Sequence, residues 1–348
     1  KLELKRVIAD QNSLPSCPSI EREALHKVAG WMENPFVVII SGLRRCGKST
    51  LMQQAKEKKP GYYVNFDDDR LASFTVMDFQ PLYEALQELY GESTTFYFDE
   101  VQNVPQWERF VRRLHDEQKK VFVTGSNATM LSRELGTRLT GRYIQAQLFP
   151  FSFREYLALR KIDADADLHR TQNRAMLSRA FEEYAKEGGL PEYLLTGNRE
   201  YLKGIYESIL YRDIIVRYNI ANEKALKELV TFTATNIGKK ISFNSVKKML
   251  GLGSPTTVKT YFDCLENSFL AFLVPRYEYS LKKQVYANKK AYMIDNALAQ
   301  QLGNRISEDS GRLLENMVFL ELKRREKEIY YFTGKNECDF ITKEKNAI

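Results

Sequence analysis

Between residues 36 and 149, short apolar runs alternate with longer segments in which apolar residues recur every three to four positions. The short runs predict buried strands, because a strand covered on both faces is apolar throughout. The longer segments predict helices with one apolar face. We expect strands at 36–41, 62–66, 94–98, 120–124 and 143–148, and helices including 48–57, 78–90 and 107–118. This order is typical of an α/β fold with a five-stranded parallel sheet covered on both faces.

After Pro150 the pattern becomes helical, with amphipathic segments at 152–160, 174–187 and 199–217. Residues 225–278 then predict a winged helix. We expect its helices at 226–237, from the segment Ile241-Ser-Phe-Asn to Leu250, and at 255–267, and its wing strand at 269–276. A short glycine-containing turn between the last two helices is the arrangement that places a recognition helix in the major groove of DNA.

The net charge of +7 is confined to one part of the chain. Residues 222–290 hold 12 basic and 5 acidic residues, which accounts for the whole excess. A concentrated basic block is typical of a surface that binds a polyanion such as DNA, although a solvated basic surface has the same composition. The predicted recognition helix has no arginine to read guanine, so a winged helix that binds protein stays open as an alternative.

The first strand leads into Gly42-Leu-Arg-Arg-Cys-Gly-Lys-Ser-Thr50, a complete phosphate-binding loop motif. Its glycines let backbone N–H groups surround the phosphates at the start of the next helix. We expect Lys48 to reach the β- and γ-phosphates of ATP and Ser49 to bind magnesium. The other nucleotide-binding positions are Gly42, Leu43, Arg44, Arg45, Cys46, Gly47 and Thr50.

The third strand ends in Asp99 and Glu100. At the carboxyl edge of such a sheet, Asp99 is expected to hold the magnesium ion and Glu100 to activate the attacking water. The fourth strand ends in Ser126-Asn127, where either residue can contact the γ-phosphate or cap the next helix. Arg142, or Arg138 before it, can serve as an arginine finger that neutralises charge in the transition state, or can be a surface residue.

Together these segments resemble the predicted AAA+ ATPases of bacteria and archaea that carry a C-terminal domain of unknown function. The resemblance rests on the phosphate-binding loop, on Phe98-Asp-Glu-Val-Gln and Val123-Thr-Gly-Ser-Asn, and on later segments: Leu139-Thr-Gly-Arg-Tyr, Phe149-Pro-Phe-Ser-Phe-Arg-Glu-Tyr, Gly188-Gly-Leu-Pro-Glu-Tyr and Gly311-Arg-Leu-Leu-Glu-Asn. It covers nearly the whole chain. It implies that the helices after Pro150 form a bundle beside the ATPase core.

Residues 286–348 look like the start of a restriction-nuclease-like fold, in which Glu315 on a helix and Asp339 on a strand would bind metal. Such sites also need a lysine on the following strand, and no residue after Asp339 fills that position. We therefore expect an inactive structural remnant. The chain begins at Lys1 rather than Met and stops within an apparent strand, so we expect it to continue at both ends.

The expected domains are an ATPase core (1–150), a helical lid (151–221), a winged helix (222–285) and a partial nuclease-like domain (286–348). Such a protein would bind and hydrolyse ATP with magnesium and use the nucleotide state to reposition the basic module on double-stranded DNA. Two alternatives stay open. One is a nucleotide switch, regulatory or defence-related, that acts on a protein partner or on further copies of the chain, and the other is an ATP-regulated nuclease.

Composition excludes several other classes of protein. The longest apolar runs are well short of the roughly 18 residues of a membrane span, and the charged first residues do not resemble a signal peptide. The four cysteines, Cys17, Cys46, Cys264 and Cys338, lack the paired spacing of a zinc site or a disulfide framework. We therefore expect a cytoplasmic protein with reduced thiols. Cys46 in the phosphate-binding loop is expected to lie near the nucleotide, unless its side chain points into the core.

Overall fold

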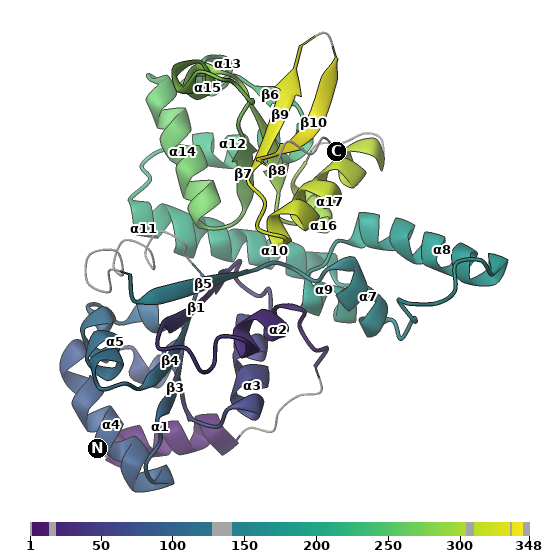
Figure 1. Ribbon diagram of the computed structural model, residues 1–348. Helices are drawn as coiled ribbons and strands as arrows, with labels where there is room; N and C mark the ends of the chain where they lie inside the picture. The colour runs from purple at the N-terminus through teal and green to yellow at the C-terminus, as the bar shows by residue number, and fades with distance from the viewer. Residues whose placement is uncertain (1, 14–18, 127–140, 304–309, 335, 344–348) are drawn as a thin grey trace. The chain divides into compact units, whose positions relative to one another are not determined.

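The computed structural model describes residues 2–13, 19–126, 141–303, 310–334 and 336–343 (Figure 1). Contacts divide the chain into two units. The first unit contains Lys1–Gly42 and Gly47–Leu148, and the second contains Leu43–Cys46 and Phe149–Ile348. The phosphate-binding loop therefore starts and ends in the first unit, while its middle residues group with the second.

The first unit is built on a five-stranded sheet in the order β2-β3-β4-β1-β5. All four strand pairings are parallel. The strands are β1 (Val37–Gly42), β2 (Tyr62–Asn65), β3 (Thr95–Asp99), β4 (Lys120–Gly125) and β5 (Tyr143–Leu148). The predicted five-stranded parallel sheet is thus confirmed. Strands β1, β3 and β4 are buried along their whole length, which explains why they read as uninterrupted apolar runs.

Helices cover both faces of this sheet. One face carries α1 (Leu2–Ser13), α4 (Phe79–Tyr90) and α5 (Trp107–Asp116), whose apolar residues share a single core with the strands. The opposite face carries α3 (Lys48–Lys58), since the Tyr97 hydroxyl donates to the carbonyl oxygens of Ala55 and Lys59 near the end of that helix. Helix α2 (Ala24–Ala29) packs against α3. The sequence analysis identified α3, α4 and α5 but not α1 or α2.

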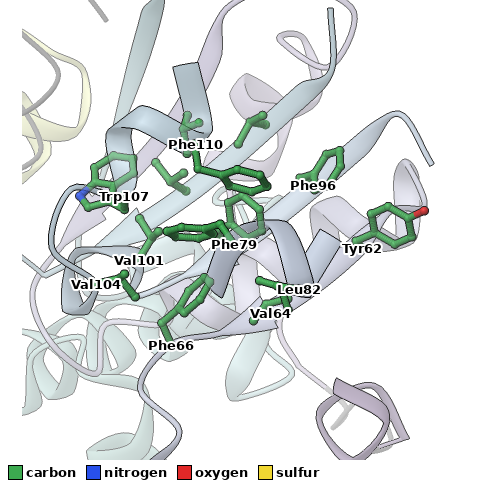
Figure 2. Close-up of a cluster of buried hydrophobic side chains, with 14 of the residues drawn as sticks. Tyr62, Val64, Phe66, Phe79, Leu82, Phe96, Val101, Val104, Trp107 and Phe110 are labelled. Carbon is green, nitrogen blue, oxygen red and sulfur yellow. The ribbon is translucent and has the colours of Figure 1, made fainter. Parts of the chain in front are cut away.

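Aromatic rings dominate the larger core (Figure 2). Phe79 of α4 stacks on Phe110 of α5 with ring centroids 4.6 Å apart. Trp107, at the start of α5, is fully buried in the same cluster, next to Val101 and Val104. Large side chains of this kind bury the most apolar area, so they fix how α4 and α5 lie on the sheet.

The second unit is mainly helical up to residue 267. Its helices there are α7 (Phe153–Leu159), α8 (Thr171–Glu187), α9 (Pro191–Thr196), α10 (Arg199–Ser208), α11 (Val216–Tyr218), α12 (Glu223–Thr235), α13 (Phe243–Met249) and α14 (Pro255–Asn267). A π-helical segment, Ile209–Ile215, joins α10 to α11. Helix α7 begins at a capping box, in which Ser152 and Glu155 satisfy each other's backbone N–H groups. Across the described residues, no helix combines the length and apolar character needed to cross a bilayer.

A three-stranded antiparallel sheet follows these helices, in the order β6-β8-β7. It consists of β6 (Lys240–Ile241), β7 (Ala271–Val274) and β8 (Lys289–Met293), with α15 (Leu281–Tyr286) between the last two strands. Helix α14 matches the predicted 255–267. Strand β8 pairs with both other strands, so the expected domain boundary at residue 285 would divide this sheet. The boundary needs correction, because β8 belongs with the helices before it.

The remaining elements of the second unit are α16 (Asn296–Leu302), α17 (Ser310–Arg324) and a hairpin of β9 (Ile329–Thr333) and β10 (Glu337–Thr342). The fully buried side chain of Asn316 on α17 accepts from the N–H of Met293, donates to its carbonyl oxygen and donates to Asn296. These bonds tie α17 to the end of β8.

The segment Gly188-Gly189 is tied to Asp295 at the start of α16. The buried Asp295 carboxylate accepts hydrogen bonds from the N–H groups of Gly189 and Leu298. Gly188 has φ +65°, and a β-carbon there would lie 2.3 Å from the Asp295 carboxylate. A β-carbon on Gly189 would lie 2.3 Å from the carbonyl oxygen of Phe151. Both glycines are therefore required for close packing.

Candidate functional site

The phosphate-binding loop joins the carboxyl end of β1 to the start of α3. Gly47 directly precedes the helix and has φ +97°, a conformation that favours glycine. A β-carbon at this position would also lie 2.7 Å from Nη1 of Arg22. The loop thus needs glycine for its backbone and for the space around it. The backbone N–H groups at the start of α3 form an anion-binding site of the kind that phosphates occupy.

Lys48 is the first residue of α3 and its side chain is almost completely buried. Its Nζ lies 3.2 Å from Oε1 of Glu100. The residue expected to bind the phosphates and the residue expected to activate water therefore meet in one place, although they are 52 positions apart in the sequence. Both charges are paired, as a buried ammonium and a buried carboxylate must be.

Asp99, the last residue of β3, is buried beneath Glu100 in a network of hydroxyl groups. The hydroxyl of Tyr63 donates to Oδ2 over 3.0 Å, and the hydroxyl of Thr124 donates to Oδ1. Burial raises the pKa of the Asp99 carboxyl, and the negative charge of Glu100 adds to this. Hydrogen bonds from Ser49, Thr124 and Tyr63 act in the opposite direction, because they favour the ionised form.

Ser49 and Asp99, which the sequence analysis expects to bind magnesium, are thus hydrogen-bonded to each other. A hydroxyl and a carboxylate are hard oxygen donors, which suit magnesium. Ser49, Asp99, Lys48 and Glu100 all belong to the first unit and gather at the carboxyl edge of its sheet. Their chemistry fits ATP with magnesium.

Glu100 lies in a strained turn directly after β3. Its φ of +50° is in the left-handed region, which is uncommon for a residue with a side chain. Its backbone N–H donates to the hydroxyl of Thr124 over 2.9 Å, and its Oε2 accepts from Nε2 of Gln102. Such strain persists only where the surroundings hold it, and it concentrates at functional sites.

The site residues predicted after β4 include Ser126, Asn127 and Arg138. Ser126 is buried at the end of this strand, which lies between β3 and β1, and its hydroxyl has no hydrogen-bond partner within the described part of the chain. A buried hydroxyl of this kind can donate to or accept from a bound group, and a contact of Ser126 with the γ-phosphate stays a prediction. Asn127 and Arg138 lie outside the described residues.

Arg142 does not lie with the other predicted site residues. It precedes β5 and its carbonyl oxygen accepts from the N–H of Val37 at the start of β1, so about 17 Å of parallel strand separates it from Gly42. Its guanidinium pairs with Asp116 at 2.8 Å. An arginine finger at Arg142 is therefore wrong for a nucleotide bound by the same chain, because parallel strands place their start and end at opposite edges of the sheet.

The two arginines of the loop contact carboxylates of the second unit, with which they group. Arg44 forms a two-point ion pair with Asp213 of the π-helical segment, at 3.2 Å from Nε and 3.4 Å from Nη2. Arg45 is exposed, has φ +64°, and lies 4.0 Å from Glu192. Both guanidinium groups therefore lie beside carboxylates of the second unit, and phosphate contacts by residues 43–46 stay a prediction.

Sequence reasoning missed three residues that build this site. Thr124 and Tyr63 hold Asp99, and the buried Arg22 lies against Gly47. The N–H of Arg22 donates to Gln54 of α3, which fixes the preceding segment on the phosphate-binding helix. Only Thr124, a hydroxyl residue at a strand end, carried a recognisable signal. The other two reach the site from distant positions that no local motif marks.

The basic block of the second unit has lysines without carboxylate partners. Within the described residues, none of the following forms an ion pair: Lys239, Lys247, Lys248, Lys259, Lys282 and Lys283. By contrast, the exposed face of α14 carries Thr256, Lys259, Thr260 and Asp263, and so has no net charge. The unpaired positive charge thus lies mostly outside the predicted recognition helix.

Glu315 and Asp339 both pair with Lys290, a residue that the sequence analysis did not consider. Nζ of Lys290 on β8 lies 2.6 Å from Asp339 and 3.2 Å from Glu315. Burial opposes the charged form of Lys290, but the two carboxylates outweigh this effect and raise its pKa. Tyr292 donates to Glu315. Within the described residues, no group of three or more acidic, histidine or cysteine residues is arranged to hold a metal.

Two stretches of the chain match known protein families. Residues 34–157 match a family described as an AAA domain, and residues 178–309 match a domain of unknown function, DUF8612. The chain is 32% identical over 321 residues to the uncharacterized protein MJ1544 of Methanocaldococcus jannaschii, covering 88% of this chain and 71% of that protein. It is 30% identical over 344 residues to an uncharacterized protein of Haemophilus influenzae, covering 93% and 84%. The chain belongs to the family of these two proteins.

A solved structure shows the same fold. The Walker-type ATPase PABY2304 of Pyrococcus abyssi superposes with a TM-score of 0.53 and 16% identity, covering 82% of this chain and 98% of that one. The resemblance to AAA+ ATPases is therefore confirmed at the level of the AAA domain and the P-loop ATPase fold. The winged helix and the nuclease-like domain stay predictions, as do the roles of the individual site residues.

The burial of Cys46 changes the expectation for its thiol. The side chain has no exposed surface, so the alternative that it points into the core is the one that the structure supports. We expect maleimide to leave Cys46 unmodified in the native protein, with or without ATP and magnesium, because an inaccessible thiol cannot react. Mass spectrometry of peptides labelled before and after denaturation checks this. Rapid native labelling of Cys46 that ATP prevents would contradict it.

Proposed function

We propose that this chain binds ATP with magnesium and hydrolyses it. The observation that carries the proposal is the convergence of Lys48, Ser49, Asp99 and Glu100 at one edge of the sheet. These four side chains supply what phosphoryl transfer to water needs: a cation for the phosphates, oxygen ligands for a metal and a base for the water. The match to an AAA domain and the P-loop ATPase fold support it.

Each residue has a defined task in this proposal. The loop backbone and the start of α3 bind the phosphates, and Lys48 turns from Glu100 to the γ-phosphate. Ser49 and Asp99 would hold magnesium, which when bound neutralises charge on the phosphate oxygens. Glu100, released from Lys48, accepts a proton from the attacking water. The ion pair between Lys48 and Glu100 describes the protein before nucleotide arrives, because the lysine cannot hold the carboxylate and the γ-phosphate in the same position.

We further propose that the nucleotide state repositions a winged helix on double-stranded DNA. The division into core, helical lid, winged helix and C-terminal domain is part of this proposal, with β8 assigned to the winged helix. The helix and strand order from α12 to β8 and the lysines without ion pairs support it. DNA phosphates would supply the negative charge that these lysines lack within the protein.

A switch that acts on a protein partner is the second candidate. The exposed face of α14 is neutral, which is unfavourable for binding DNA bases, and large apolar side chains are exposed after β7, at Tyr279, Leu281 and Tyr286. Large exposed apolar side chains that lie together are typical of protein contacts. We do not extend the proposal to a nuclease, because the two acids that would bind metal are already ion-paired with Lys290.

Replacing Lys48 by Ala should abolish nucleotide-dependent turnover. The loss of a charge that acts on the transferred phosphoryl group lowers the rate by at least about 100-fold. The measurement is phosphate release by purified protein, with the melting temperature to verify folding. Lys58→Ala is the matched control, because Lys58 is exposed at the far end of the same helix. Unchanged hydrolysis in Lys48→Ala protein would refute the proposed function.

Replacing Glu100 by Gln should separate binding from chemistry. The amide keeps the shape but cannot accept the proton, so we expect a fall of about 100-fold in turnover while ATP still binds. Single-turnover hydrolysis and the nucleotide Kd are measured together. Glu92→Gln, an exposed change just before the same strand, is the control. A fall of less than a few-fold would remove Glu100 from the role of base.

Reversing charge in the basic block tests DNA binding. Changing Lys247, Lys248 and Lys259 to Glu should weaken duplex binding and reduce the slope of log K against log salt by about three, one for each phosphate that the lysines no longer neutralise. Titrations at several salt concentrations measure both effects. The control replaces three exposed basic residues elsewhere by Glu: Lys58, Arg109 and Lys161. Equal affinity for the two triple variants would favour the protein-binding alternative.

A further inference from the structure

Gln102 lies two residues after Glu100, in a short 3-10 turn that the protein core holds in place. The turn spans Val101–Asn103. Val101 and Val104 point into the aromatic core beside Trp107, as residues three apart in such a turn do (Figure 2). The amide of Asn103 donates to the carbonyl oxygen of Phe66, which fixes the other end of the turn. The backbone of this segment therefore has little freedom, and Gln102 is the one residue of the turn directed at the site.

The side-chain amide of Gln102 has one end occupied and one end without a partner. Its Nε2 donates to Oε2 of Glu100, while Oε1 of Glu100 faces Lys48. Its own Oε1 is buried and has no hydrogen-bond partner among the described residues, although the residue is only 7% exposed. A buried carbonyl oxygen is nearly always hydrogen-bonded, so an exception next to a reactive carboxylate indicates a group that binds there.

We propose that Gln102 positions both the base and the nucleophile of ATP hydrolysis: its Nε2 orients Glu100, and its Oε1 accepts a hydrogen bond from the attacking water. This inference rests on the proposed ATPase activity. A primary amide suits the task because it donates at one end and accepts at the other. It stays neutral and keeps both of its protons throughout.

Water, ATP and Glu100 account for every bond and proton in the hydrolysis step. The water oxygen forms a bond to the γ-phosphorus while the bond from that phosphorus to the ADP oxygen breaks. The proton of the water passes to Glu100, and Gln102 holds the water oxygen in line by accepting from its second O–H. Two hydrogen bonds from one rigid turn fix the distance between base and water, and such positioning is worth a large part of the rate.

The test compares Gln102→Ala and Gln102→Glu with the wild type in steady-state and single-turnover hydrolysis. We expect kcat to fall about 10- to 100-fold in both variants, as a misplaced nucleophile requires. The nucleotide Kd, measured with a fluorescent ATP analogue, should change less than about threefold, because Gln102 contacts no part of the nucleotide in this proposal. Gln102→Glu is informative because it keeps size and an acceptor oxygen but loses the donor.

A control variant and a double variant are measured in the same way. Gln87→Ala, an exposed glutamine on α4, should leave kcat unchanged. In a Glu100→Gln background, adding Gln102→Ala should have little further effect, because residues that act as a unit are not additive. A full-sized additional fall in turnover there would overturn the proposal.

The remaining outcomes are equally decisive. Unchanged turnover in Gln102→Ala would overturn the inference, and so would faster turnover, which would make Gln102 a brake on Glu100. A parallel fall in nucleotide affinity and rate would indicate only a structural role and also overturn it. Failure of the ATPase proposal itself is distinguishable, since the wild type would then hydrolyse no ATP.

Discussion

The hydroxyl of Thr124 is the interaction on which the candidate site depends. It accepts a hydrogen bond from the backbone of Glu100 and donates one to the side chain of Asp99, so one fully buried group on β4 holds the last residue of β3 and the residue after it. This is possible only because the two strands are parallel neighbours, whose carboxyl ends meet at one edge of the sheet. The same contact holds the N–H of Glu100 at the start of its left-handed turn.

A buried acid with three hydroxyl donors is an unusual concentration of polar groups in an apolar core. Asp99 has Phe98 before it in the strand and the aromatic cluster on one side of the sheet. Its carboxylate is tolerated there because Ser49, Thr124 and Tyr63 satisfy its oxygens. Burial would otherwise favour the neutral acid, which cannot bind a metal. The hydroxyl network thus offsets part of the effect of burial, although the pKa of Asp99 stays raised.

Sequence reasoning identified the residues whose signal lies in the residues next to them in the chain. The phosphate-binding loop, Asp99 and Glu100 were identified because each combines an apolar strand with a short polar motif, and the strands could be predicted from burial on both faces. Sequence reasoning failed for residues whose contact partners are distant in the sequence. Nothing near Arg22 signals that it lies against Gly47, and nothing near Lys290 signals that it pairs with Glu315 and Asp339. Arg142 was assigned from its neighbours alone, but strand direction places it at the wrong edge of the sheet.

The contact between Gly189 and Asp295 also has a consequence for how the chain is made. The two residues are 106 positions apart, and the Asp295 carboxylate occupies space that the glycine pair leaves open. A ribosome adds about 5–20 residues per second, so roughly 5–20 seconds pass between synthesis of the glycines and arrival of their partner. Until then the N–H of Gly189 lacks this acceptor, so the contact is among the late ones to form. The first unit, complete by residue 148, has no such delay and can fold while the rest of the chain is still being translated.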